Sequence, residues 1–329
     1  MQFTRRFFSQ LCAAILILPL TSAPFAAEWS FGVIPDTQWA VKMDAPFHGT
    51  AIYVIDAINA EMIRHKVDFV IQVGDLVETA SVDAFQTRAA RNKSLADAGI
   101  KFYPVRGNHD AGNMELVDEF LKIFSDRPVG SSPNLPSAAG MTYAFAHKGG
   151  KFICLDTFPL VNDNSESGKA YTVGDYLPWM ESELKNDDHR FALVFAHKNI
   201  QGQNHQDNLF GNNHDSEPDM QNDFIGCLQR NGVRYFLSGH DHMYHRSQIK
   251  SPDGLSEIGQ IICGSAAHKF YDPVLPLSER DSPIAQELNR IGFFIVHVRE
   301  DSIRFEYYST EPFGAEPEMP TWELRDSFE

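Results

Sequence analysis

The segment Y-F-L-S-G-H-D-H at residues 235–242 joins a short apolar run to two histidines that are two positions apart. Its aromatic and aliphatic residues are typical of a buried strand. Side chains just beyond the carboxyl ends of parallel strands converge in one crevice of an open α/β sheet. Alternate residues of an extended segment project to the same side, so His240 and His242 can reach neighbouring ions. The segment therefore predicts an α/β fold with a metal site at its strand ends.

Four earlier apolar runs end in the same way, each followed by short polar residues and often by a glycine. These endings are P-D-T-Q at 35–38, G-D at 74–75, R-G-N-H-D at 106–110 and A-H at 196–197. Stretches with helical periodicity separate the runs, and three strand–helix units follow one another before residue 125. This alternation predicts a largely parallel sheet with crossover helices.

The rest of the chain has the pattern of antiparallel pairs. Gly149 and Gly150 separate apolar runs at 141–147 and 151–155, which predicts a hairpin. Pro218 suits the first turn of a helix, and strands are expected at 260–263, 293–298 and 303–308. No repeat or linker divides the chain, so we expect one catalytic domain over residues 28–310 and an acidic, loosely attached tail over 311–329. Four long polar loops, at 126–140, 157–175, 199–217 and 271–289, are candidates for lids or substrate contacts.

The first 27 residues have the composition of an export signal. Arg5 and Arg6 precede an apolar stretch at 11–18 and small residues up to Ala27. The segment T-R-R-F-F at 4–8 resembles a twin-arginine signal, and an ordinary secretory signal with two chance arginines is the alternative. The apolar core is too short to span a bilayer, so we expect a periplasmic or secreted protein without stable membrane association.

The charge of the chain excludes some classes of partner. The formal net charge is −16, and loss of residues 1–27, which hold two arginines and no acids, would bring it to about −18. Nucleic acid and anionic membranes are therefore not expected partners. An anionic substrate would need a local positive centre, such as a bound metal. Cys154, Cys227 and Cys263 lack regular spacing and are expected to be small buried residues, with one disulfide pair left open.

Each polar residue at a strand end has an ordinary explanation when it is taken alone. Asp36 and Asn108 are typical of turns or helix caps, and a single histidine such as His197 is more often a core or loop residue. Their combination is harder to explain by chance, because carboxylates, one amide and three imidazoles would meet at strand ends of one sheet. Such a set predicts a site for two metal ions without thiolate ligands.

Together these segments resemble the motif series of the calcineurin-like metallophosphoesterases. The resemblance rests on D-T-Q at 36–38, G-D at 74–75, G-N-H-D at 107–110, F-A-H-K-N at 195–199 and G-H-D-H at 239–242, in the family's order over residues 30–245. The continuation H-M-Y-H-R-S at 242–247 is similar to purple acid phosphatases, although Glu78 stands where that subgroup has an iron-binding tyrosine. The resemblance implies an α/β fold of two packed mixed β-sheets flanked by helices.

The resemblance also implies two sets of metal ligands that share one carboxylate. One ion would be bound by Asp36, Gln38, Asp75 and His242, and the second by Asp75, Asn108, His197 and His240. Gln38 departs from the commoner D-x-H pattern, so direct and water-mediated binding are both open for its amide oxygen. Mixed imidazole and oxygen ligands suit Mn, Fe or Zn better than Ca or Mg. His245 is expected to have a supporting or structural role.

These residues predict an exported hydrolase of small phosphate monoesters or diesters. A hydroxide shared by the two ions would attack phosphorus, and His109, oriented by Asp110, would protonate the leaving oxygen. A non-catalytic periplasmic protein that binds metal or phosphate is the alternative. A serine or cysteine hydrolase is disfavoured because the sequence has no G-x-S-x-G. Four further residues receive no role, namely His205, His214, His268 and Lys269, and the sequence leaves the oligomeric state open.

Overall fold

The structure is a computed structural model that describes residues 28–39, 50–127, 129–135, 138–158, 171–185, 189–313 and 320–329. The predicted export signal at residues 1–27 lies outside this part of the chain. Within the described part, no helix is both long enough and apolar enough to cross a membrane.

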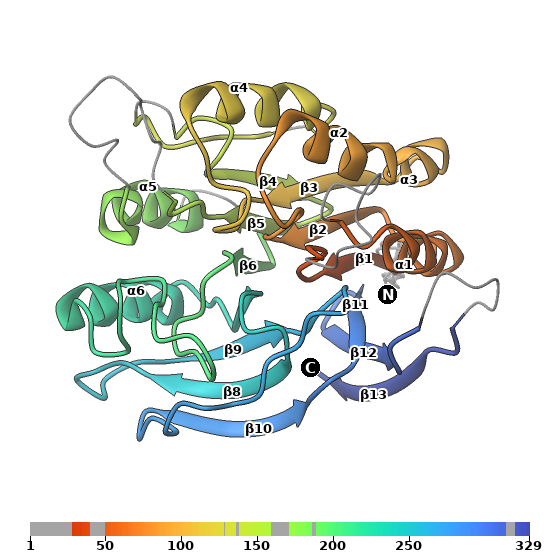
Figure 1. The fold of residues 1–329 in the computed structure, drawn as a ribbon. Coiled ribbons are helices and arrows are strands. Elements are labelled where there is room, and N and C mark those ends of the chain that lie inside the picture. Colours follow the sequence, from red (N-terminus) through yellow and green to blue (C-terminus); the bar gives the residue numbers. More distant parts are fainter. Residues whose placement is uncertain are drawn as a thin grey trace, which may run out of the picture.

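Two mixed β-sheets pack face to face in the middle of the molecule (Figure 1). The first sheet contains, in spatial order, β13 (Glu323–Phe328), β12 (Ile303–Thr310), β11 (Ile291–Val298), β1 (Trp29–Ile34), β2 (Phe69–Val73) and β3 (Lys101–Val105). The second contains β10 (Asp281–Glu287), β8 (Tyr244–Lys250), β9 (Glu257–Cys263), β7 (Tyr235–Ser238), β6 (Phe191–Phe195), β5 (Gly150–Cys154) and β4 (Tyr143–His147). The predicted fold class is confirmed.

The core between the sheets is formed by alternate residues of the strands, because the pleat turns every second side chain to the same face. Phe31 of β1, Phe69 of β2 and Phe152 of β5 meet there, with Phe31 stacked on Phe69 at a ring-centroid distance of 5.1 Å. The Phe152 ring meets the Phe69 ring edge-on, also at 5.1 Å. Both sheets therefore contribute to one aromatic layer, which fixes their relative position.

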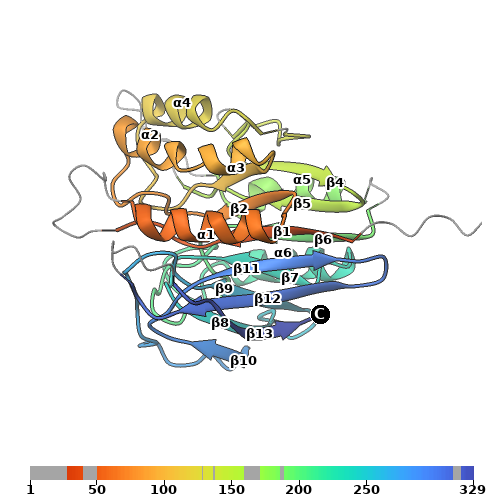
Figure 2. The ribbon, with the colours of Figure 1, turned by 90° about the vertical axis from the view of Figure 1, so that its right-hand side faces the viewer.

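Helices cover the outer faces of both sheets. The first sheet is covered by α1 (Ile52–Arg64), α2 (Val82–Ala90), α3 (Lys93–Asp97) and α4 (Met114–Ile123), of which α1 lies at the front in Figure 2. The second is covered by α5 (Val173–Lys185) and α6 (Pro218–Arg230). The side chains of Ser81 and Asn113 accept hydrogen bonds from backbone N–H groups in the first turns of α2 and α4, which is the usual N-cap arrangement. Pro218 begins α6 as predicted.

The predicted hairpin is β4 and β5, joined by a two-residue turn. Lys148 and Gly149 both have positive φ angles, 43° and 82°, as a tight turn that matches strand twist requires. The three cysteines of the described chain are free and buried, so the open disulfide pair is not formed.

Two predictions about loops and termini are wrong. The C-terminal tail is not loose throughout, because Glu323–Phe328 forms β13 and pairs with β12 in antiparallel register. The predicted loop at 271–289 contains β10, which pairs with β8 at the edge of the second sheet. Most side chains of both edge strands are at least partly exposed, so neither has the apolar alternation that indicates a strand.

Candidate metal centre

Three predicted ligands meet at the carboxyl ends of strands from both sheets. Asp36 follows β1, Asp75 follows β2 and His197 follows β6, and one potential ligand atom from each lies within 4.8 Å of the other two. His197 Nε2 is 3.3 Å from Asp75 Oδ2. All three side chains are buried. His197 Nδ1 lies 3.0 Å from the carbonyl oxygen of Val73, which orients the ring and leaves Nε2 facing Asp75.

Gln38 and His242 lie on one side of this group. His242 Nε2 is 3.5 Å from Asp36 Oδ1 and 3.0 Å from the Gln38 amide. His242 Nδ1 lies 2.9 Å from the Lys269 carbonyl oxygen, so this nitrogen carries the proton and donates it. The lone pair of His242 Nε2 is therefore directed towards the two neighbours, as a metal ligand requires.

Asn108 and His240 lie on the other side. Asn108 Oδ1 is 3.0 Å from His197 Nε2, and the His240 ring centroid is 5.0 Å from that of His197. The backbone N–H of His240 donates to Asp36 Oδ1 at 3.1 Å. His240 Nε2 faces Asp207 Oδ1 at 3.3 Å, which leaves Nδ1 as the nitrogen that could bind an ion. The structure thus brings all seven predicted ligands together, and we call this group of seven side chains the cage.

The backbone around the cage has an uncommon conformation. Asp75, His240 and His242 have φ angles of 45°, 72° and 47°, in the left-handed region that side-chain-bearing residues rarely adopt. Each such residue costs on the order of 1–3 kcal/mol and persists only where the surrounding structure imposes it. Such residues cluster at functional sites, so this conformation supports the assignment of the cage.

Glycines beside the ligands provide the space that the ligand side chains occupy. A Cβ atom at Gly107 would lie 2.1 Å from Asp75 Oδ1, and one at Gly239 would lie 2.3 Å from Asp36 Oδ2. These distances are far below van der Waals contact, so no other residue fits without displacing a carboxylate. The glycines of the G-N-H-D and G-H-D-H segments are therefore required by packing.

The electrostatics of the cage indicate that it is suited to a cation. Burial raises the pKa of Asp36 to about 7, opposed by His197 and reinforced by the neighbouring Asp75. Burial also raises the pKa of Asp110 to about 7, again with a contribution from Asp75. For His242, burial lowers the pKa to about 3, so its imidazole is neutral and able to bind a metal. Burial lowers the pKa of His197, but Asp75 and Asp36 outweigh burial and raise it to about 9, so a bound cation would take the place of that proton. Buried carboxylates beside imidazoles, without thiolates, fit Mn, Fe or Zn.

His109 lies at the edge of the cage, with its side chain 28% exposed. Its backbone N–H donates to Asp75 Oδ1 at 2.9 Å, and its Nδ1 lies 2.6 Å from the Glu78 carbonyl oxygen. Asp110 does not orient this ring as predicted. Its carboxylate instead accepts hydrogen bonds from three backbone N–H groups, those of Leu76, Val77 and Gly107, and so braces the turns around Asp75. The Glu78 carbonyl oxygen takes the orienting role.

Two neighbours of the cage could not be assigned from the sequence. His205 Nδ1 is 2.8 Å from Asp241 Oδ1, and the His205 ring lies 4.2 Å from that of His240. Lys269 Nζ is 3.5 Å from Glu78 Oε2 and also reaches the Gln38 amide. Both residues come from loops, and no spacing in the sequence indicates either contact.

Different surroundings are found for three further histidines, His245, His268 and His214. His245 lies at 3.5 Å from Asp281 and contacts Gln286, which agrees with the expected supporting role. His268 stacks on Trp39 at 4.9 Å. His214 uses its backbone carbonyl oxygen to accept hydrogen bonds from neighbouring side chains.

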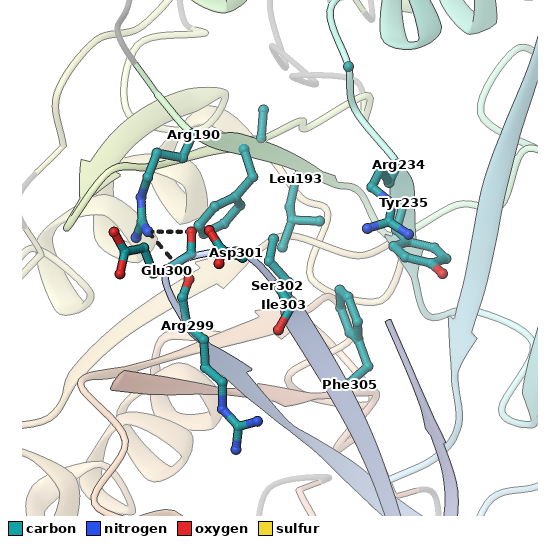
Figure 3. Close-up of a pocket in the computed structure, with 13 residues that line it drawn as sticks. Arg190, Leu193, Arg234, Tyr235, Arg299, Glu300, Asp301, Ser302, Ile303 and Phe305 are labelled. Carbon is teal, nitrogen blue, oxygen red and sulfur yellow. Dashed lines mark hydrogen bonds between the residues drawn. The ribbon is translucent and has the colours of Figure 1, made fainter. Parts of the chain in front are cut away.

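A separate cavity of about 150 Å³ lies at the opposite ends of β6 and β7 (Figure 3). The five residues of β6 separate this cavity from the cage, which corresponds to about 15 Å at about 3.3 Å per residue. Leu193 and Phe305 line it, and Arg190 lies at its border. The Arg190 guanidinium donates to the backbone carbonyls of Arg299 and Glu300, at 3.3 and 3.0 Å. Because these backbone contacts occupy the Arg190 guanidinium, we assign no binding site to this cavity.

Carboxylate, amide and imidazole groups that converge at the strand ends of a two-sheet α/β fold are typical of metal-dependent hydrolases. The family model of the calcineurin-like phosphoesterases matches residues 30–244. The chain belongs to this family, whose members are metal-dependent phosphoesterases. A search of curated proteins finds no match.

Solved structures of low sequence identity share the fold. A purple acid phosphatase from yellow lupin (Lupinus luteus) seeds superposes with a TM-score of 0.62 at 14% identity. The superposition covers 92% of this chain and 53% of the lupin chain. The structure of PhoD gives a TM-score of 0.62 at 15% identity, with coverages of 92% and 69%. A dimetal phosphatase from Danio rerio gives 0.53 at 15% identity, with coverages of 85% and 95%. The chain thus spans about half the length of the lupin protein.

Proposed function

We propose that this protein hydrolyses small phosphate monoesters or diesters with the help of two metal ions, after export to the periplasm or secretion. The observation that carries the proposal is the position of Asp75, which lies between two groups of potential ligands. His197 and Asn108 are on one side of it, and Gln38 and His242 are on the other. A carboxylate in this position can be shared by two ions.

Two bound ions would stabilise charge on the phosphoryl oxygens and lower the pKa of a water molecule. The protein contributes a candidate proton donor at the edge of the same cage. His109 Nδ1 donates to the Glu78 carbonyl oxygen, so the proton delivered to the leaving oxygen of the ester would be the one that Nε2 carries in the imidazolium form of the ring. The partly exposed position of the ring is compatible with contact to a substrate that enters from solvent.

The first test is hydrolysis of p-nitrophenyl phosphate and bis(p-nitrophenyl) phosphate by the ion-stripped protein, with Mn, Fe or Zn added back. We expect metal-stimulated release of p-nitrophenol from at least one ester, and the ratio of the two rates would distinguish a monoesterase from a diesterase. No stimulated turnover on either ester, by protein that binds the ions, would favour the alternative of a non-catalytic metal- or phosphate-binding protein.

The second test concerns the role of His109. His109→Ala should lower kcat by about 10²–10⁴-fold while the metal content stays at the wild-type level. The loss should be larger for an alkyl phosphate than for p-nitrophenyl phosphate, because p-nitrophenolate leaves with little need of a proton. His297→Ala, which removes a partly exposed histidine of β11, is the matched control. An equal loss on both esters would argue against proton donation by His109.

Export can be tested separately from catalysis. The proposal rests on the composition of residues 1–27, and it predicts that the protein recovered from the periplasm or medium lacks these residues. Mass spectrometry of the intact protein would give the cleavage position. Retention of the full-length chain in the cytoplasm would overturn this part of the proposal.

A further inference from the structure

The amide of Gln38 has polar neighbours at both of its ends. One end lies 2.9 Å from Asp75 Oδ2, and the other lies 2.7 Å from Lys269 Nζ and 3.0 Å from His242 Nε2. The Gln38 side chain is buried, with 1% of the residue exposed. Because both ends are in contact, the orientation of the amide is determined by what each neighbour can accept or donate.

Lys269 fixes which end carries the oxygen. An ammonium group has three N–H donors and no acceptor, so an NH₂ group at 2.7 Å would face it donor to donor. The amide oxygen must therefore point to Lys269, and the NH₂ group then donates to the Asp75 carboxylate. Lys269 Nζ is itself held near Glu78 Oε2, at 3.5 Å. Lys269 thus connects the Glu78 carboxylate with the Gln38 amide.

This orientation places two lone pairs opposite each other. His242 donates from Nδ1 to the Lys269 carbonyl oxygen, so its Nε2 is an acceptor, and the Gln38 oxygen at 3.0 Å is an acceptor as well. Two acceptors at this distance repel each other unless a cation lies between them. An amide oxygen has two lone pairs, so it can accept from Lys269 with one and bind an ion with the other.

We propose that Lys269 is a positioning residue that turns the Gln38 amide oxygen towards the ion that Asp36, Asp75 and His242 would hold. The Gln38–Lys269 pair then takes the place of the imidazole in the commoner D-x-H pattern. A histidine needs no such partner to present a lone pair, whereas an amide can present either of its ends. This inference rests on the proposed function, because it assumes that the cage binds metal.

A double-mutant cycle on metal affinity tests the proposal. Ion-stripped wild type, Lys269→Met, Gln38→His and the double variant would be titrated with Mn²⁺ in a calorimeter, without substrate. Lys269→Met should weaken one of the two binding steps by about 10–100-fold, as loss of a group that orients a ligand usually does, and leave the other step within about threefold. In the Gln38→His background, the same lysine substitution should change neither step by more than about threefold.

Two further variants separate positioning from other effects. Lys269→Arg keeps a donor for the amide oxygen, so its metal affinity should stay within a few-fold of wild type, in contrast to Lys269→Met. A merely structural role would not predict this difference. Lys122→Met removes an exposed lysine on α4 and is the matched control. Melting temperatures of the ion-free variants would show whether each one folds.

Two results would overturn the inference. The first is Lys269→Met with wild-type affinity for both ions, and the second is an equal loss of affinity in the presence and absence of Gln38. These results differ from failure of the proposed function. If the wild type binds two ions and the cycle shows coupling, but no phosphoester is hydrolysed, the role of Lys269 stands and the hydrolase proposal fails.

Discussion

Replacing Gly107 by alanine should damage the cage without removing any ligand. Gly107 follows β3 and lies directly against Asp75. The new Cβ atom would be 2.1 Å from Asp75 Oδ1 and 2.3 Å from the Asp75 backbone nitrogen. One of these neighbours is main chain, so the contact cannot be relieved by rotating a side chain. The Asp75 segment and the Gly107 turn would have to move apart by roughly 1 Å.

The expected loss of stability comes from two terms. Overpacking of this kind costs about 1–3 kcal/mol. Moving the carboxylate also weakens the hydrogen bond that the His109 N–H donates to Asp75 Oδ1, and a bond to a charged group contributes about 1.5–3 kcal/mol. We therefore expect the free energy of unfolding of the ion-free protein to fall by about 2–5 kcal/mol. Affinity for both ions should fall together, because both share Asp75.

Urea unfolding of the ion-free protein and Mn²⁺ titration would measure these two effects. Gly226→Ala is the control, because Gly226 lies inside α6 and its added Cβ would meet only the end of the flexible Arg230 side chain and a more distant serine. Alanine within a helix should stabilise the protein by about 0.5–1 kcal/mol. Wild-type stability and wild-type metal affinity in Gly107→Ala would refute the packing argument.

Three further predictions concern single carboxylates. Asp75→Asn should lower metal-stimulated turnover by at least about 10²-fold and reduce the number of bound ions, because it removes the shared charge; steady-state rates and metal analysis would check this. Asp156→Asn should cost about 3–5 kcal/mol in urea unfolding, since Arg106 would keep a buried charge without its partner at 2.8 Å. Asp68→Asn should lower stability most at pH values above about 4. Burial raises the pKa of Asp68, but hydrogen bonds led by that from Lys148 outweigh burial and the pKa is lowered. The stabilising contribution is at most about 1 kcal/mol, because the Asp68 side chain is partly exposed and solvent screens its contacts. It is present above the unfolded pKa of 3.8 and is lost as the pH falls through the lower folded value. Urea unfolding of both forms at pH 7 and pH 3 should show a smaller difference at pH 3.

The parts of the fold that were predicted correctly are those with strong local patterns. The buried strands that precede Asp36, Asp75 and His197 are largely apolar runs, with Ser30 and Gln72 as their polar residues, and each ligand follows its strand within two residues. Sequence position therefore determines spatial position at these points. The edge strands β10 and β13 lack this pattern, because their side chains face solvent and Pro283 interrupts the first of them.

The parts of the site that were missed depend on contacts between distant loops. Lys269 reaches Gln38 from a position 231 residues later in the chain, and no spacing rule connects the two. Asp110 was assigned to His109 because the two are adjacent in sequence. The turn sends the Asp110 carboxylate towards the backbone of Leu76, whereas the His109 ring points to Glu78. Adjacent residues in a tight turn commonly have different surroundings.

The left-handed backbone at Asp75, His240 and His242 has a consequence for metal choice. Asp75 follows β2 and the two histidines follow β7, so strands of both sheets hold the beginnings of these turns in place. An incoming cation must adapt to a rigid arrangement of hard oxygens and borderline nitrogens that several first-row metals can tolerate. We therefore expect the ions found in the purified protein to follow those supplied during growth, and the catalytic rate to differ more between metals than the occupancy does.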